Sequence, residues 1–419
     1  MTTETTKNKG WLVVFAGVAI NLALGILYSW SIFKDSISKS IDTGGDGAFT
    51  WSKAALNDPY AVCILVFAFS MILAGKIQDK YGPRVTALIG GVLVGIGFFI
   101  LSSTTSYALW VLGFGVLAGM GIGFGYSAAT PPALKWFPSS KTGVVAGIVV
   151  SGFGLAPVYI APLATYLVNN FGLQHAMLIF AILFILVVCG AALLLQNPPA
   201  GYIAHDKSNT DTQTTKPIAS KDFTVKEILK TPSFYLIWVI FFIASGAGLM
   251  VIGSISGMAK KSMGEAAFVA VAIMAIGNAS GRIIAGLVSD KIGRVLTLLI
   301  IIVFQASLMF ASMLLIGGNT EALLIVLLAT FIGFNYGTNL SLFPSFTKSF
   351  WGMKNFGVNY GVLMSAWGLG GFIFSRLSQT IVAKTGTHTT SFIIAGSCLL
   401  VCALLALVLK HIEKKQITA

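Results

Sequence analysis

The chain has 419 residues, of which 56% are hydrophobic and only 10% are charged, and its formal net charge is +13. Soluble globular domains average about 25% charged residues, so this composition excludes a soluble globular protein. It indicates a polytopic membrane protein.

Apolar segments of roughly 20 residues recur along the whole chain, and each is long enough to cross the ~30 Å hydrocarbon core of a bilayer. We expect all of them to be helices. The first segment is too long for the apolar part of a signal peptide and has no small-residue cleavage site after it, so it counts as a span. The twelve predicted spans are residues 11–33, 53–76, 85–103, 107–131, 143–169, 174–196, 234–258, 266–288, 294–317, 321–346, 356–382 and 390–410.

Lysine and arginine residues are concentrated in the segments that lie on one side of these spans. If the N-terminus is cytoplasmic, the inner segments carry most of these residues and the outer segments carry few. The positive-inside rule therefore places both termini in the cytoplasm. The net charge then reflects topology and contact with anionic membrane lipid, and it requires no nucleic-acid partner.

The spans fall into two sets of six. The longest polar loop predicts a cytoplasmic linker at 197–233 between an N-terminal half, 1–196, and a C-terminal half, 234–419. Each half contains a matching loop after its second span, GKIQDKYGPR at 75–84 and GLVSDKIGR at 286–294. Such a repeat is typical of a transporter built by duplication. The shared positions are Gly75, Asp79 and Arg84 in the first loop and Gly286, Asp290 and Arg294 in the second.

The paired G-x-x-x-D-K-x-G-(x)-R loops in a frame of twelve helices resemble the cytoplasmic motif of the major facilitator superfamily. This resemblance implies an all-α membrane protein with a 6+6 pseudo-symmetric fold. Asp79 and Asp290 have the chemistry to accept N–H groups at helix N-termini and to pair with nearby cations. We expect them to latch the cytoplasmic ends of the two halves when these ends are closed.

Further segments are similar to those of the monocarboxylate transporters and of the bacterial oxalate/formate antiporters. They are GILYSWSIF (25–33), SGFGLAP (151–157), SLFPSF (341–346) and NYG (359–361), together with Arg282 in the eighth span. The resemblance implies a carrier of small carboxylates. In the antiporters a lysine shortly after NYG supplies a second cation, whereas Trp367 occupies that position here. Leu27 stands near the place of a helix 1 lysine of the mammalian transporters.

Arg282 lies in the middle of the eighth span, where a charge is costly unless it is paired or faces a water-filled cavity. The chain has 14 acidic residues, and none lies at this depth. We therefore predict that the partner is the substrate, a small carboxylate bound by the guanidinium group. Bonding to backbone carbonyls and water is the alternative. A single cation favours a monocarboxylate, such as formate, acetate, lactate or pyruvate, over oxalate.

Other polar and aromatic side chains at similar depth are candidates to line the substrate site. Asn278 precedes Arg282 by one helical turn on the same face, where it can orient the guanidinium group or bind a substrate hydroxyl. Tyr126 and Tyr28 match cavity aromatics of the related antiporters. Packing between helices is the alternative role for these residues and for the remaining candidates. Those are Tyr336, Asn335, Leu27, Phe153 and Trp367.

Importing a monoanion against an inside-negative potential costs about 2.3 kcal/mol per 100 mV, and a co-transported proton removes this cost. Mammalian relatives have an aspartate one turn before the arginine, where this chain has Asn278, which cannot titrate. Asp58 is the one carboxylate clearly inside a predicted span, and Arg376 stands at comparable height. We expect the two to form an ion pair of the outer gate that is linked to proton binding, with a purely structural contact as the alternative.

These features predict a proton-coupled symporter of a small monocarboxylate, with L-lactate favoured, in a bacterial inner membrane. Electroneutral exchange of such anions is the second candidate. The duplicated frame argues against a channel. The four histidines lie at helix ends or in loops, and no metal-binding or nucleotide-binding motif occurs. We therefore expect no enzyme activity, no metal and no cofactor.

Overall fold

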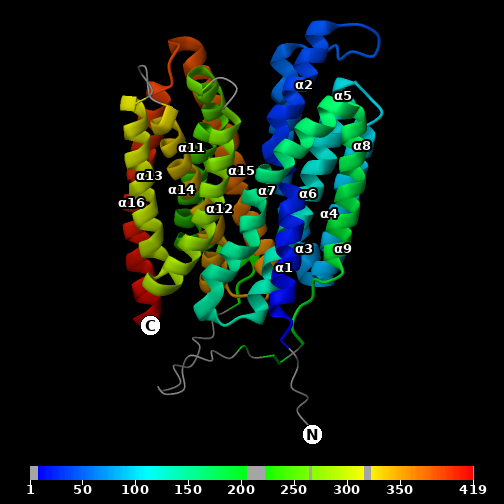
Figure 1. Ribbon diagram of the computed structural model, residues 1–419. Coiled ribbons are helices and arrows are strands. Elements are labelled where there is room, and N and C mark those ends of the chain that lie inside the picture. Colours follow the sequence, from blue (N-terminus) through cyan, green and yellow to red (C-terminus); the bar gives the residue numbers. More distant parts are fainter. Residues whose placement is uncertain are drawn as a thin grey trace.

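The structure is a computed structural model that describes residues 8–199, 201–202, 204, 222–263, 267–315 and 322–418. Within these ranges every regular element is a helix (Figure 1). A helix satisfies its own backbone hydrogen bonds, which is what a segment surrounded by lipid requires. The all-α fold predicted from the apolar segments is therefore confirmed.

The first half of the chain forms one bundle, in which several long rods contain a short 3₁₀ or π-helical segment. Its elements are α1 (Gly10–Leu24), η1 (Gly25–Ser29), α2 (Trp30–Thr43), η2 (Lys53–Asn57), α3 (Asp58–Tyr81), α4 (Pro83–Leu101), α5 (Tyr107–Trp110), η3 (Val111–Ala118), α6 (Gly119–Trp136), η4 (Ser139–Lys141), α7 (Thr142–Phe171), α8 (Leu173–Phe184), η5 (Ile185–Cys189) and α9 (Gly190–Ala192).

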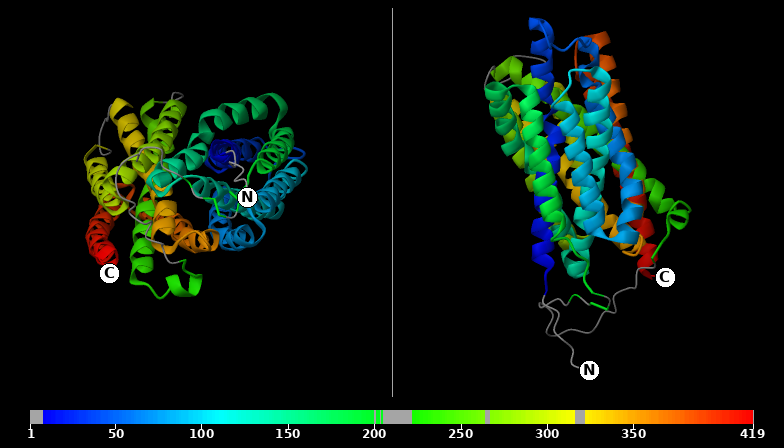
Figure 2. Two further views of the ribbon diagram at one scale, coloured as in Figure 1. Left: turned by 90° about the horizontal axis from the view of Figure 1, so that it is seen from below. Right: turned by 90° about the vertical axis from the view of Figure 1, so that its right-hand side faces the viewer.

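The second half forms a bundle beside the first (Figures 1 and 2). Its elements are α10 (Val225–Ile228), α11 (Pro232–Met263), α12 (Ala267–Ile292), α13 (Arg294–Leu315), α14 (Ala322–Trp351), α15 (Phe356–Thr385) and α16 (Thr389–Thr418). The two bundles meet where α3 packs on α15 and where α7 packs on α12 and α14.

Eleven helical rods in the described part of the chain are long and apolar enough to cross a membrane. They correspond to eleven of the twelve predicted spans. The twelfth, predicted at 356–382, is the 30-residue helix α15, whose sequence contains more polar residues. The first rod continues to Thr43, well past the predicted end at residue 33, because α2 is amphipathic: it buries Trp30, Phe33 and Ile37 and exposes most of its polar residues.

The first described helix begins, and the last one ends, at the same end of the molecule (Figure 1). We call this the terminal end and the opposite one the distal end. The carboxylates of the two repeated loops bridge the halves at the terminal end. Asp79 of α3 accepts hydrogen bonds from the backbone N–H groups of Gly357 (3.0 Å) and Val358 (2.9 Å), in the first turn of α15.

The second loop makes the equivalent contact in the opposite direction. Asp290 of α12 accepts hydrogen bonds from the N–H groups of Gly143 (2.8 Å) and Val144 (2.9 Å), in the first turn of α7. Unpaired N–H groups at a helix N-terminus favour a negative charge. Neither carboxylate pairs with a lysine or arginine within 4 Å in the described part of the chain, so the expected additional ion pairs do not form in this conformation.

The loop glycines allow the backbones to approach closely at these contacts. A Cβ atom on Gly75 would overlap the carbonyl oxygen of Gly357, and one on Gly286 would overlap that of Gly143. The loop arginines differ from each other. Nε of Arg84 donates to the carbonyl of Leu195 at 2.7 Å, whereas Nε of Arg294 is buried without a hydrogen-bond partner in the described part. The two halves are thus held together at the terminal end.

Candidate substrate-binding site

A cavity of about 570 Å³ lies between the two halves in the distal part of the molecule. Several of its outermost lining residues, including Arg376 and Gln379 of α15, are exposed, so the cavity opens toward the distal end. Because the terminal end is closed, the structure has the form of a carrier open on one side only. Other lining residues are Leu27, Tyr28, Lys34, Asp58, Tyr60, Gly154, Met250, Met274, Asn278 and Phe372.

Arg282 of α12 lies just beyond the floor of this cavity and is fully buried. Its Nε donates a hydrogen bond of 3.0 Å to Oδ1 of Asn278, and its Nη1 donates to the backbone carbonyl of Val150 on α7, in the other half. Its Nη2 is buried and has no hydrogen-bond partner within the described ranges. Gly154, which lines the cavity, leaves space beside the guanidinium group: a Cβ atom there would lie 3.2 Å from Nε.

No described carboxylate neutralises Arg282. Among the described residues the only ion pair within 4 Å joins Lys53 and Asp42, which are both exposed. A guanidinium group in a membrane interior is costly, and hydrogen bonds to an amide and a carbonyl leave its charge uncompensated. The arrangement therefore provides a fixed positive charge with an unused donor next to a cavity.

A hydrogen bond between two tyrosines also joins the two halves. The hydroxyl groups of Tyr28 in η1 and Tyr336 in α14 lie 3.0 Å apart, and Nε1 of Trp367 in α15 donates to the Tyr336 hydroxyl at 2.9 Å. Tyr28 lines the cavity, whereas Tyr336 and Trp367 are buried behind it. Trp367 thus uses its polar atom to fix Tyr336 and does not face the cavity.

Aromatic rings pack together behind the cavity floor. Phe153 makes edge-to-face contacts with Tyr28 and Tyr126, at centroid distances of 5.3 and 5.4 Å. Phe67 of α3, which we did not select from the sequence, contacts Trp367 at 5.1 Å. Tyr126 and Phe153 are buried and are absent from the cavity lining. These rings form a rigid support for Tyr28.

Two other candidates occupy different positions. Leu27 lines the cavity and presents an apolar surface. Asn335 is buried outside the lining; its Nδ2 donates to the carbonyl of Phe331 in its own helix, and its Oδ1 has no hydrogen-bond partner within the described ranges.

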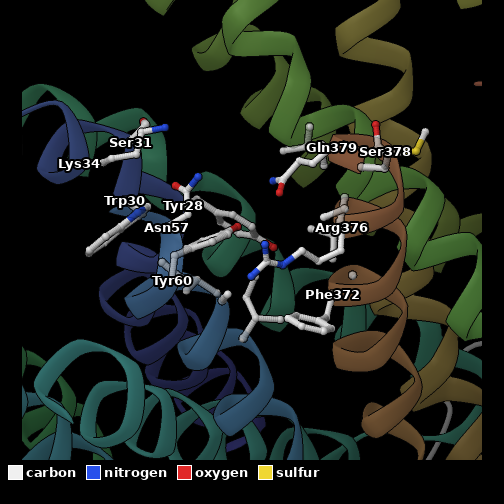
Figure 3. A pocket seen from close by; sticks show the side chains of 18 of the residues that line it. Tyr28, Trp30, Ser31, Lys34, Asn57, Tyr60, Phe372, Arg376, Ser378 and Gln379 are labelled. Atoms are coloured by element: carbon white, nitrogen blue, oxygen red, sulfur yellow. The ribbon is translucent and has the colours of Figure 1, made fainter. Parts of the chain in front are cut away.

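Asp58 and Arg376 line the same cavity but do not pair. Oδ2 of Asp58 instead accepts a hydrogen bond of 2.8 Å from the hydroxyl of Tyr107. Arg376 extends from α15 toward Tyr28 and Tyr60 of the other half (Figure 3). The expected ion pair is therefore not formed while the distal side is open.

Sequence reasoning missed Lys34, Asn57 and Tyr60, which also line the cavity. Lys34 lies near the start of α2, Asn57 is the last residue of η2 and Tyr60 is in the first turn of α3, and polar residues in such places look like ordinary surface residues in the sequence. The cavity brings these positions together with residues of α15 around a common space.

A family model of the major facilitator superfamily matches residues 10–375. The chain is 28% identical to an uncharacterized MFS-type transporter of Escherichia coli, with 88% of each chain covered. It is 26% identical to the oxalate:formate antiporter of Oxalobacter formigenes (97% of this chain and 93% of the relative) and 25% identical to monocarboxylate transporter 13 of Rattus norvegicus (96% and 89%).

Among solved structures, the Escherichia coli fucose:proton symporter has the same fold, with a TM-score of 0.63 over 94% of this chain and 98% of that chain, at 16% identity. The fold, the paired loops and the family model agree with one another. The chain belongs to the major facilitator superfamily.

Proposed function

We propose that the protein carries a small monocarboxylate, with L-lactate as the favoured substrate, together with a proton across a bacterial cytoplasmic membrane. Both termini lie in the cytoplasm in this proposal, so the described cavity faces outward. The observation that supports it most strongly is the buried Arg282, which has an unused Nη2 and no described carboxylate partner.

A carboxylate supplies the hydrogen-bond acceptor and the negative charge that Arg282 lacks. A buried donor without an acceptor costs roughly 1–3 kcal/mol, and more when the donor is charged. A substrate carboxylate accepts from the guanidinium fork and cancels its charge in one step. The relatives named for oxalate and formate and for monocarboxylates support a small carboxylate as the substrate class.

The surroundings of Arg282 favour a short organic acid. Asn278 and Tyr28 line the cavity and offer polar groups to a substrate hydroxyl, while Leu27 and Met274 provide apolar contact for a short carbon chain. Because a single buried cation compensates a single carboxylate, a monoanion suits the site better than a dianion.

Contacts that cross between the halves link substrate binding to alternating access in this proposal. The bond from Arg282 to the Val150 carbonyl joins α12 to α7, and the Tyr28–Tyr336 bond joins η1 to α14. A carboxylate that takes over guanidinium donors changes the balance of these cross-half contacts. Substrate binding therefore acts on the interface that has to rearrange when the opposite side opens.

Asp58 is the proposed proton site, because it is the one carboxylate among the described lining residues. Protonation would remove its negative charge and weaken its acceptance of the Tyr107 hydroxyl. Exchange of one monoanion for another is the second candidate, since it is electroneutral without a proton.

Uptake of radiolabelled L-lactate by cells that make the protein tests this proposal. We expect faster uptake at acidic than at neutral external pH and a loss of uptake with a protonophore. Uptake that changes neither with external pH nor with a protonophore, but accelerates when the cells are preloaded with formate or pyruvate, would favour exchange. The absence of monocarboxylate uptake under both conditions would contradict the proposal.

A further inference from the structure

Two lysine or arginine side chains line the cavity itself, Lys34 of α2 and Arg376 of α15. Neither lies within 4 Å of a carboxylate oxygen in the described part of the chain. The carboxylate among the described lining residues, Asp58, accepts a hydrogen bond from Tyr107. The described wall of the cavity therefore carries an excess of positive charge that does not depend on the buried Arg282.

Arg376 is the cation that reaches into the middle of this space. Figure 3 shows its side chain extending from α15 toward Tyr28 and Tyr60, whereas Lys34 lies near Ser31, further toward the distal end. The guanidinium carbon of Arg376 lies 6.0 Å from the ring centre of Phe372. The N–H groups of this guanidinium group donate no hydrogen bond to a described residue. These donors are available to an anion in the cavity.

An anion that enters the cavity from the distal end reaches Arg282 only after it has passed Arg376. Arg282 is fully buried and outside the cavity lining, while Tyr28 lines the cavity and bonds to Tyr336. An anion that enters from the distal end thus meets Arg376 before it can reach Arg282. Gln379 follows Arg376 by three residues on α15 and also lines the cavity, so the two side chains share one face of the helix.

We propose that Arg376, assisted by Gln379, forms an outer binding site for small carboxylate anions, at which the substrate stops before it moves to Arg282. The assignment of Arg282 as the inner site rests on the proposed function; the outer site itself does not. An exposed guanidinium group in a water-filled cavity binds weakly but raises the local concentration of anions. It acts on the capture of the substrate and leaves the later conformational change unaffected.

The first test compares Arg376→Gln with Lys384→Gln in proteoliposomes. Lys384 is an exposed cation on the same helix, and it is absent from the cavity lining. We expect Arg376→Gln to raise the KM for L-lactate about fivefold at low salt, to keep kcat within about twofold, and to weaken the salt dependence of uptake. Lys384→Gln should behave as wild type, and Arg376→Lys should restore part of the loss. An unchanged KM, or a loss of kcat alone, would overturn the proposal.

The second test does not require transport. Ser375 lines the cavity next to Arg376, so Ser375→Cys provides a thiol reporter. The test compares the reaction rates of the Ser375→Cys thiol with an anionic and a cationic methanethiosulfonate reagent. The ratio of the anionic to the cationic rate should fall several-fold when Arg376→Gln is added and should not change with Lys384→Gln.

A ratio that does not respond to Arg376→Gln would refute the outer anion site. A falling ratio in a protein that transports no monocarboxylate would support the site and contradict the proposed substrate. The two proposals can therefore fail separately.

Discussion

Nε of Arg282 donates a hydrogen bond of 3.0 Å to Oδ1 of Asn278, one turn earlier on α12. The amide fixes the orientation of the guanidinium group without neutralising it. A carboxylate at this position would act as an internal counter-ion and compete with an anionic substrate. The neutral side chain therefore keeps the charge of Arg282 available.

Asn278→Asp should weaken substrate binding. We expect the KM for L-lactate to rise at least tenfold at neutral pH, because the new carboxylate takes over the guanidinium donors. Such a charge-assisted interaction is worth roughly 1.5–3 kcal/mol. Acid should reduce the loss, since protonation of the new carboxyl group releases Arg282. The measurement is initial uptake rate against concentration at two pH values. A KM equal to that of wild type would show that Arg282 does not bind the substrate anion.

The hydroxyl groups around Tyr336 predict unequal effects of two similar substitutions. Tyr28→Phe removes one hydrogen bond between the halves, which is worth about 0.5–1.5 kcal/mol. Tyr336→Phe also leaves the buried Nε1 of Trp367 without its acceptor, so it should cost more. Thermal unfolding of the purified variants should show a larger drop in Tm for Tyr336→Phe. Equal drops would mean that the Trp367 bond contributes little.

The close approach of α12 to α7 predicts that Gly286→Ala prevents full closure of the terminal end. Overpacking of this kind typically costs about 1–3 kcal/mol. Spin labels on Lys39 and Lys384, exposed residues near the distal ends of opposite halves, should report a shift to shorter distances as the distal side closes.

Gly190→Ala is the matched control, because a Cβ atom there meets nothing within 4 Å. We expect this variant to keep the wild-type distance distribution. Identical distributions for Gly286→Ala and wild type would show that the glycine contact does not control closure.

Asp58→Asn tests the proposed proton site. The amide cannot bind and release a proton, so lactate uptake should lose its stimulation by acid and its sensitivity to a protonophore. The control is Asp42→Asn, which removes an exposed carboxylate that is paired with Lys53. If Asp58→Asn transports L-lactate with an unchanged pH dependence, protons move by another route or not at all.

The sequence predicted the membrane fold well because each span is a long apolar segment, and lipid leaves few alternatives to a helix. The length of the first rod was not predicted, since the amphipathic α2 continues the helix beyond its apolar part. Arg282 was selected as a candidate because a charge in an apolar segment is conspicuous.

The aromatic part of the site was harder to predict. In an apolar helix a tyrosine or phenylalanine that lines a cavity has the same sequence surroundings as one that only packs. Tyr60 was therefore missed, whereas Tyr126 and Phe153 are buried behind the floor. The expected Asp58–Arg376 ion pair is not formed in the described conformation, and a single sequence does not specify which conformation is described.

The central claim is that Arg282 binds the carboxylate of the substrate. The most direct test is binding of L-lactate and of its uncharged amide, lactamide, to the purified wild-type protein and to Arg282→Leu, a variant of similar size without the charge. We expect wild type to bind lactate and not lactamide, and Arg282→Leu to lose lactate binding by roughly 2–5 kcal/mol, the usual cost of removing one partner of a buried charge pair. Lactate binding by a folded Arg282→Leu protein with wild-type affinity would contradict the account.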